Sequence, residues 1–409
     1  MKFRLPGATA IAAVMVAMVA AAPLAIAPAH AQNGQAQVQL TKQMVAPMNE
    51  ARNAMMAKDW ATARTKLDAA AAQAKTPADK AQLERLRLYM ASETKDGAAQ
   101  VASINSLLAS GTLTPDEVKQ YKGALAKAHL DAGNQPASLA AYKAYIDEYG
   151  GTPDQLISIA NDYMKANDAA TAATYADKAI NAQRANGKVL ESWYKLNLRA
   201  LNALGQMDKY YALLETLVAE YPNEAYWRDM IARVQKEPKY GIATRLDLFR
   251  TLDAAGVKLT SQEVSLAGDE ALKRGLPNEA LKFLEPAGVT SEFDTKNLAS
   301  AKSLAASDKA GLAKETAEIL KKGDAAAIAS IGEAHLSYGD NAKAIEVLQA
   351  ALAKGISDAD EAALVKLHLG IAQFRSGDED AARATWAEVK SDNGATVLAH
   401  NWILISKLK

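Results

Sequence analysis

The 409-residue chain contains no cysteine. This excludes structural disulfides and thiolate metal sites, as well as the lipid-bearing cysteine of a bacterial lipoprotein. Aromatic residues make up only 6% of the chain, and 47 basic side chains balance 47 acidic ones, so the formal net charge is zero. A neutral chain has no overall electrostatic attraction for DNA or RNA, and we expect neither to be a partner. The charge gives no indication of a role at a membrane surface either.

The sequence also lacks the usual signatures of catalysis. Its five histidines form no His-x-x-x-His pair, and there is no G-x-S-x-G, phosphate loop or dinucleotide fingerprint. Residues 192–195 (SWYK) and 391–393 (SDN) match two parts of the penicillin-binding signature, but no Lys-Thr-Gly follows them. We interpret both matches as chance, and we expect no catalytic residue, metal or cofactor.

The N-terminus has the features of a secretory signal. Lys2 and Arg4 precede an uncharged stretch, and residues 29–31 (AHA) supply a small-x-small cleavage pattern. An uncleaved membrane anchor is the alternative, but two prolines and abundant alanine disfavour a spanning helix. We expect residues 1–31 to be a cleaved signal and residues 32–37 to be flexible. The mature chain should then reach the periplasm without a transmembrane span.

Alanine is abundant, which favours helix, and short polar breaks recur between the helical stretches. They begin at Lys58, Lys95, Gly133, Asn167, Gly205, Tyr240, Gly275, Ser307, Gly339 and Gly377, at spacings of 32 to 38 residues. Gly or Asn can end a helix in the left-handed conformation, and Asp or Asn can cap the next helix. The pattern therefore predicts about ten two-helix units.

The repeating unit resembles the tetratricopeptide repeat, an antiparallel helix pair of about 34 residues. The best matches are residues 262–289, 325–352 and 363–390. The residues at structural positions of the repeat are Gly268, Gly275, Ala280, Gly332, Gly339, Ala344, Gly370, Gly377 and Ala382. We expect the small residues within helices to allow close approach of two backbones.

This resemblance implies an all-α fold. Residues 38–409 should form a single right-handed superhelix, an α-solenoid of about ten antiparallel helix pairs. The apolar segment from Ala395 to Lys409 should be an extra helix that caps the C-terminal end of the stack. The pattern does not define the unit boundaries within residues 71–125 and 225–325.

Solenoids of this kind bind extended peptides or partner helices on a concave face lined by the first helix of each pair. Counting along the repeat assigns a small basic and amide cluster to that face: Asn161, Lys165, Lys195, Arg199 and Asn202. Such a cluster could hold a carboxylate or an acidic peptide through charge-assisted hydrogen bonds. The alternative is an ordinary solvated helix face.

Other conspicuous residues have structural interpretations. His335 stands where the family has an aromatic residue, so we expect it to be partly buried between helices. Aromatic residues cluster in one span, and we expect them in the core, although exposed rings could stack on a sugar: Trp193, Tyr194, Tyr210, Tyr211, Tyr226 and Trp227. The same counting brings Leu367, Ile371 and Phe374 to the concave face beside Arg375, where we expect the capping helix rather than a partner's helix to contact them.

The resemblance implies a non-catalytic scaffold that binds protein or peptide partners in the cell envelope. Two alternatives remain open at this point. One is a module that binds glycan or peptidoglycan through the aromatic span, and the other is a hydrolase with an unrecognised site. The sequence defines neither the partner nor the oligomeric state.

Overall fold

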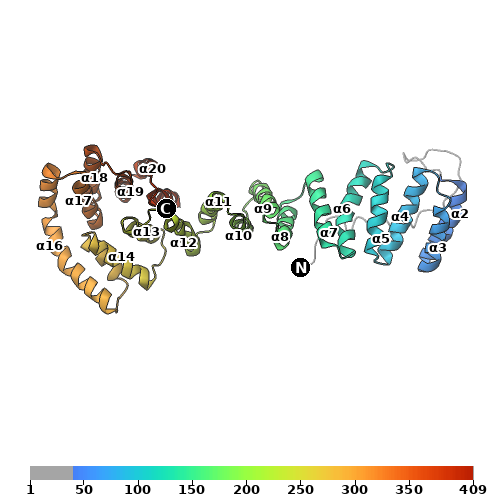
Figure 1. Ribbon diagram of the computed structural model, residues 1–409, viewed down its shortest axis with the longest axis horizontal. Helices are drawn as coiled ribbons and strands as arrows, with labels where there is room; N and C mark the ends of the chain where they lie inside the picture. The colour runs from blue at the N-terminus through green and yellow to red at the C-terminus, as the bar shows by residue number, and fades with distance from the viewer. Residues whose placement is uncertain (1–39, 409) are drawn as a thin grey trace. The chain divides into compact units, whose positions relative to one another are not determined.

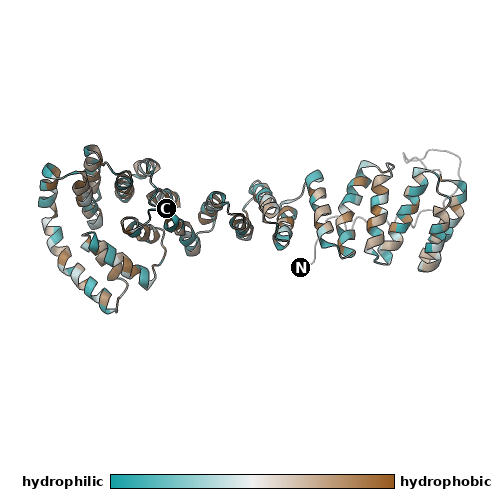
Figure 2. Ribbon diagram, in the orientation of Figure 1, coloured by the Kyte–Doolittle hydropathy of each residue, from teal (hydrophilic) through white to brown (hydrophobic). Residues whose placement is uncertain are grey.

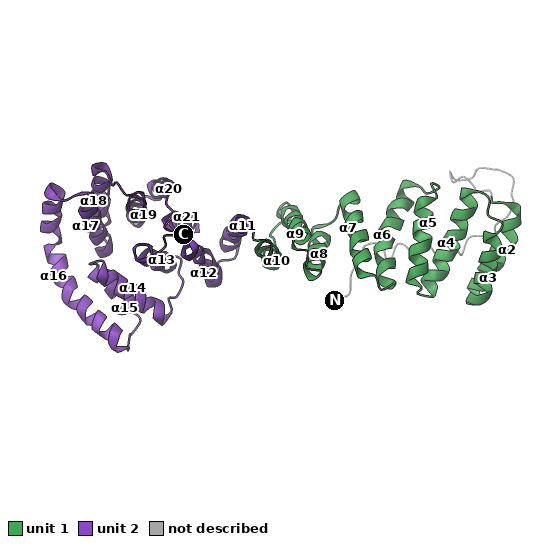
Figure 3. Ribbon diagram, viewed as in Figure 1, with its two compact units in different colours: residues 1–205 green, residues 206–409 purple. Residues whose placement is uncertain are grey.

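The computed structural model describes residues 40–408, so the predicted signal and the flexible segment lie outside the described part. Within residues 40–408 the chain forms 20 α-helices and one 3-10 helix, η1, and no strand, as the sequence predicted. None of these helices is both long and apolar enough to cross a membrane. The chain divides into two compact units, residues 1–205 and 206–409 (Figure 3), which are described separately.

Unit 1 is a series of antiparallel helix pairs. The pairs are α2/α3, α4/α5, α6/α7 and α8/α9, and α10 packs on α9 and α8. These helices are labelled in Figure 1. Their bounds are α2 Lys42–Met56, α3 Trp60–Ala71, α4 Pro77–Glu93, α5 Gly97–Ala109, α6 Pro115–Asp131, α7 Gln135–Tyr149, α8 Pro153–Lys165, α9 Ala169–Arg184 and α10 Glu191–Ala203.

Three first helices of unit 1 begin with the same local device. Thr76, Thr114 and Thr152 lie 38 residues apart, and each is followed by a proline. Each threonine hydroxyl accepts a hydrogen bond from the backbone N–H three residues later, and the side chain there accepts from the threonine N–H in return. Such a capping box satisfies two backbone donors that the first turn would otherwise leave unpaired.

The turns between paired helices occur where the sequence predicted most of the breaks. Eight of the ten predicted breaks hold a residue with φ between +56° and +90°: Lys58, Lys95, Gly133, Asn167, Gly205, Gly275, Gly339 and Gly377. An aspartate or asparagine follows directly at most of these turns and caps the next helix, as Asp340 does for residues 341–354. This left-handed residue ends one helix and reverses the chain.

The break predicted at Ser307 was wrong. Residues 292–322 form one continuous helix, α16, and Ser307 lies in its middle with its hydroxyl donating to the Leu304 carbonyl. Alanine and lysine predominate on both sides of Ser307, and the helix propensity of these residues outweighs one serine. Tyr240 lies between η1 and the next helix, so the chain does turn there, but without a left-handed residue at that position.

Unit 2 contains α11 to α21. The bounds are α11 Met207–Glu220, α12 Glu224–Ala232, η1 Val234–Lys236, α13 Ile242–Ala254, α14 Ser261–Lys273, α15 Pro277–Leu284, α16 Glu292–Lys322, α17 Ala325–Tyr338, α18 Asn341–Lys354, α19 Ala359–Arg375, α20 Glu379–Ala387 and α21 Ala395–Leu408. Helices α14/α15, α17/α18 and α19/α20 form antiparallel pairs of the predicted type.

The C-terminal helix closes unit 2 on itself. As predicted, α21 packs on the last helix pair, α19 and α20, but it also contacts α11, α12 and α13 at the start of the unit. Figure 3 shows α21 beside α12 and α13. At this junction the Thr244 hydroxyl donates to the Asn393 carbonyl over 2.8 Å, across 149 positions of sequence. The unit is therefore a closed circuit of helices.

The small residues predicted in the helices do lie at close helix contacts. A Cβ atom on Gly332 would come within 2.8 Å of Leu348, one on Gly268 within 2.6 Å of Leu284, and one on Gly370 within 2.2 Å of Trp386. The small residues on the facing helices, Ala280, Ala344 and Ala382, are fully buried. Most helices carry hydrophilic and hydrophobic residues side by side (Figure 2), as expected for pairs that bury one face.

Candidate functional site

The five residues predicted to bind a partner lie on two neighbouring first helices of unit 1. Asn161 and Lys165 are on α8, whereas Lys195, Arg199 and Asn202 are on α10, which contacts α8. Asn161 is half-buried and the other four are exposed. The structure therefore brings them to adjacent helices, and their binding role stays a prediction.

Carboxylates on the same helices neutralise part of this cluster. Lys165 forms an ion pair of 3.0 Å with Asp162, and Lys195 forms one of 2.8 Å with Glu191. Arg199 has no ion pair or hydrogen bond with another side chain of residues 40–408 that would balance its charge. The cluster thus carries a net charge of about one, which favours an acidic partner only weakly at physiological salt.

Most of the aromatic residues predicted to be core are buried, whereas Tyr210 is half-buried. Trp193 is 6% exposed and Trp227 is 4% exposed, and Tyr194, Tyr211 and Tyr226 are buried as well. Stacking on a sugar requires an accessible ring face, so these two tryptophans do not form the platform that a glycan-binding module would need.

His335 is buried, as its place in the repeat predicted. It is 4% exposed, and its Nε2 lies 2.8 Å from the Thr316 hydroxyl on α16. Its Nδ1 lies 3.1 Å from Asp340, the residue that caps α18. The imidazole thus joins α16, α17 and the turn before α18, which is a structural role.

A buried charge network in unit 2 was not predicted. Arg250 on α13 is 3% exposed and contacts carboxylates from three helices. Its guanidinium lies 2.6 Å from Asp247 on α13, 2.7 Å from Glu279 on α15 and 2.8 Å from Glu333 on α17. His368 on α19 completes the network, with its Nε2 2.9 Å from Asp247. We call these five residues the Arg250 network.

The charges of the Arg250 network stabilise one another. Burial alone would raise the pKa of Asp247 and of Glu333, but His368, Arg250 and Arg274 hold both pKa values below their ordinary range. Burial also acts to lower the pKa of Arg250, yet Glu279, Asp247 and Glu333 hold it well above its ordinary value. Asp247, Glu333 and Arg250 therefore hold one another in the charged form.

The residues of α19 that were counted to the concave face are covered. Leu367 and Ile371 are both fully buried, and His368 of the Arg250 network is the next residue after Leu367. Phe374 meets the capping helix at Trp402, with ring centroids 6.0 Å apart. The predicted contact with the capping helix is thus confirmed for Phe374. In unit 2, α21 of the same chain therefore occupies part of the surface that a partner would use.

A sequence signal for the network did exist. Asp247 and Arg250 are three residues apart within the otherwise apolar run LDLFRTL, where charged side chains at helical spacing have no solvent to face. This pattern indicates paired buried charges, although it cannot name partners that lie 29 to 121 positions further along the chain.

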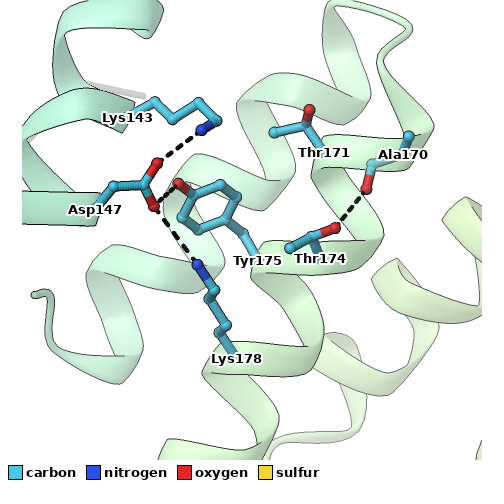
Figure 4. A pocket seen from close by; sticks show the side chains of 7 residues that line it. All are labelled: Lys143, Asp147, Ala170, Thr171, Thr174, Tyr175 and Lys178. Carbon is cyan, nitrogen blue, oxygen red and sulfur yellow. Dashed lines mark hydrogen bonds and ion pairs between the residues drawn. The ribbon is translucent and has the colours of Figure 1, made fainter.

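A small open pocket lies between α7 and α9 in unit 1 (Figure 4). Its volume is about 310 Å³, at the low end of the range for small-molecule sites. Asp147 accepts from Lys143 and from the Tyr175 hydroxyl, and Lys178 lies 3.5 Å from it (Figure 4). The pKa of Tyr175 is raised, first by burial and then by Asp147. The pocket is on second helices, so it is separate from the predicted cluster, and its one carboxylate is already fully engaged.

Residues 40–408 hold no group of three or more His, Asp and Glu side chains arranged to bind a metal ion. In the Arg250 network, Arg250 takes the central place that a cation would require.

Similarity to known proteins is found among solved structures. No family model and no curated protein matches the chain. One similar solved structure is a tetratricopeptide repeat protein from Parabacteroides merdae, 14% identical over 80% of this chain and 100% of that one, with a TM-score of 0.28. Another is in the complex of Naa15/Naa10 bound to HypK-THB, 15% identical over 87% of this chain and 60% of that one, with a TM-score of 0.29.

The class of fold follows from the helix pairs of the chain itself. Antiparallel helix pairs recur, and a residue in the left-handed backbone conformation forms the turn within most pairs. A small residue on the first helix of a pair contacts a large residue on the second. The protein is therefore an all-α solenoid of tetratricopeptide type, in which the second unit is closed by its own C-terminal helix.

Proposed function

We propose that the protein is a non-catalytic scaffold that binds a protein partner on the first helices of unit 1. The observation that carries this proposal is the contrast between the two units. Exposed polar side chains lie on adjacent first helices α8 and α10 in unit 1, whereas on α19 in unit 2 Leu367 and Ile371 are buried and Phe374 contacts α21. Unit 1 thus offers the open surface, and unit 2 is a stable support.

Site-specific crosslinking tests this assignment. A photoreactive residue replaces Arg199 on α10 in one variant and Lys178 on the second helix α9 in a control variant, and both are expressed in the native host. We expect a defined protein to crosslink from position 199 and not from position 178. Equal crosslinking from both positions, or none from position 199, would contradict the proposal.

The charge of the cluster gives a second test. Arg199→Glu combined with Lys195→Glu should leave the helical circular dichroism unchanged and weaken capture of an acidic partner. We expect the Arg199 substitution to contribute more, because Lys195 is already compensated by Glu191. Unaltered capture by the double variant would show that the partner binds elsewhere than on α8 and α10.

We further propose that the scaffold works in the periplasm, as part of the cell envelope. Support for this location comes from the N-terminal pattern alone: two basic residues, an uncharged stretch and AHA at 29–31. Fractionation of cells that express the full chain, with mass spectrometry of the mature N-terminus, tests it. Retention of residues 1–31 on a cytoplasmic protein would refute it.

A further inference from the structure

One arginine of unit 2 stands apart from the rest. Seven arginines lie between residues 206 and 408, and six of them form an ion pair with a carboxylate. Arg375, at the C-terminal end of α19, has no ion pair and no hydrogen bond with any described residue, and its side chain is exposed. Five guanidinium N–H donors are therefore available at this position.

A second cation lies near it. Lys282 on α15 is exposed, and its ammonium group has no carboxylate partner within the described chain. Its Nζ donates to the Ser337 carbonyl on α17 over 2.6 Å, and the Asn278 amide donates to the same carbonyl. Because an ammonium group has three N–H donors, Lys282 keeps two of them available.

Both cations lie on the helix faces that carry the Arg250 network, further toward the C-terminal ends of α15 and α19. Lys282 follows Glu279 by three residues on α15, Ser337 follows Glu333 by four on α17, and Arg375 follows His368 by seven on α19. Residues at these spacings share one face of a helix. Since Glu279 and His368 both meet Arg250, these spacings place Lys282 and Arg375 toward the same end of the network.

The electrostatics agree with this placement. The pKa of Lys282 is lowered, first by partial loss of hydration and then by repulsion from Arg375. The pKa of Arg375 is lowered by the same loss of hydration and by Arg250. Glu279 and Asp253 oppose these effects, but Glu279 is bound by Arg250, and Asp253 makes no ion pair with either cation. Two cations that repel each other are thus held together by the fold.

From this geometry we infer that Lys282 and Arg375 form a binding site for an oxyanion, either a carboxylate or a phosphate group. The planar guanidinium can make two parallel hydrogen bonds to such a group, and the ammonium group adds a point charge beside it. An oxyanion between them would relieve the repulsion and use donors that the chain leaves available. This site is independent of the predicted cluster on α8 and α10.

Thermal unfolding of the full mature chain tests the inference. The probes are inorganic phosphate and the acetylated, amidated peptide Glu-Glu-Glu, each compared with sodium chloride at equal ionic strength. We expect at least one probe to raise the melting temperature of unit 2 by about 2–4 °C, the shift expected when about 1 kcal/mol is gained in a unit of this size. Arg375→Gln should abolish the shift, whereas Arg383→Gln, which removes an arginine already paired with Glu379 and Asp380, should retain it.

The probes also separate the two sources of the oxyanion. A shift with phosphate alone identifies a phosphate site, a shift with the peptide alone identifies a carboxylate site, and a shift with both supports a common oxyanion site. Calorimetric titration should then show at least about tenfold weaker binding by Lys282→Gln, the loss expected for one charge-assisted hydrogen bond. No shift beyond that of sodium chloride, or an equal shift in wild type and Arg375→Gln, would overturn the inference.

Discussion

Arg250 on α13 and Glu333 on α17, 83 positions apart in sequence, meet over 2.8 Å inside unit 2. Both side chains are buried, and the same guanidinium also binds Glu279 and Asp247. Its neighbour Arg274 binds the second oxygen of Glu333 over 2.7 Å. Helices α13, α15 and α17 and the residue that caps α14 are therefore joined through two arginines.

Removing the central arginine should destabilise unit 2 strongly. Arg250→Met preserves most of the side-chain volume but leaves three carboxylates without their main partner. We expect a loss of about 3–5 kcal/mol, the usual cost of removing one partner from a buried ion pair. Hydrogen exchange followed by mass spectrometry measures this loss locally, in peptides from α13, α17 and α19.

The matched control is Arg383→Met. Arg383 pairs with Glu379 and Asp380 at the surface, and such pairs contribute about 0–1 kcal/mol. Protection of α13, α17 and α19 in Arg250→Met as high as in this control would show that the network does not stabilise the unit.

Acid should loosen unit 2 through the same network. The folded pKa values of Asp247 and Glu333 lie below their ordinary values. Their contribution to the free energy of unfolding is thus fully present above the unfolded pKa values, about 3.9 and 4.3, and is lost as pH falls through the folded ones. We expect hydrogen exchange in α13 and α17, compared after correction for the intrinsic rate, to accelerate below about pH 4.

Asp247→Asn tests the origin of this acid sensitivity. The variant should be less stable than wild type at pH 7, because Arg250 and His368 lose a charged partner. Its stability should then fall less steeply on acidification, because one titrating carboxylate has been removed. An acid profile parallel to that of wild type would assign the sensitivity to other carboxylates.

The close helix contact at Gly332 gives a third prediction. A Cβ atom there would lie 2.8 Å from Leu348 side-chain atoms, so Gly332→Ala should destabilise by about 1–3 kcal/mol through overpacking. Gly332→Leu should be worse. Urea unfolding monitored by circular dichroism measures the change.

Gly311 provides the control for the Gly332 prediction. It lies within α16, and a Cβ atom there would have no neighbour within 4 Å. Gly311→Ala should therefore stabilise by about 0.5–1 kcal/mol, since only helix propensity changes. Equal effects of the two alanine substitutions would contradict the assigned packing at Gly332.

The features that the sequence predicted correctly are those set by local chemistry. A left-handed turn needs only a suitable residue and a following cap, so Gly339 with Asp340 was recognisable within a few positions. Contacts such as Gly332 with Leu348 repeat at a fixed offset, which makes them visible as a period. Local chemistry also explains why the break predicted at Ser307 was wrong. The helix propensity of the neighbouring residues outweighs the lower helix propensity of one serine.

The closed form of unit 2 could not be read in this way. It depends on α21 reaching α11, α12 and α13, and on partners of Arg250 that lie 29 to 118 positions away in sequence. No repeat offset connects these residues. Arg375 was recognised only as a neighbour of the groove, and Lys282 was not singled out. Neither residue belongs to a sequence motif, and only the structure shows that each lacks a carboxylate partner among the described residues.

The junction before α21 should control whether unit 2 stays closed. Gly394 has φ of +95°, and a Cβ atom there would lie 2.7 Å from Val234, the first residue of η1. Gly394→Ala should therefore combine backbone strain with a steric clash. Gly355 has a similar φ of +91° but no neighbour within 4 Å of its Cβ position, so Gly355→Ala carries the backbone strain alone.

We expect each variant to lose about 1–3 kcal/mol from strain, and Gly394→Ala to lose a similar amount again from the clash. The readout that distinguishes them is hydrogen exchange in α21 and α13, which should accelerate in Gly394→Ala and remain near wild type in Gly355→Ala. Faster exchange in both variants to the same degree would mean that the Val234 contact does not hold α21 in place. Selective opening by Gly394→Ala would instead show that docking of the last helix stabilises α13, which α21 contacts.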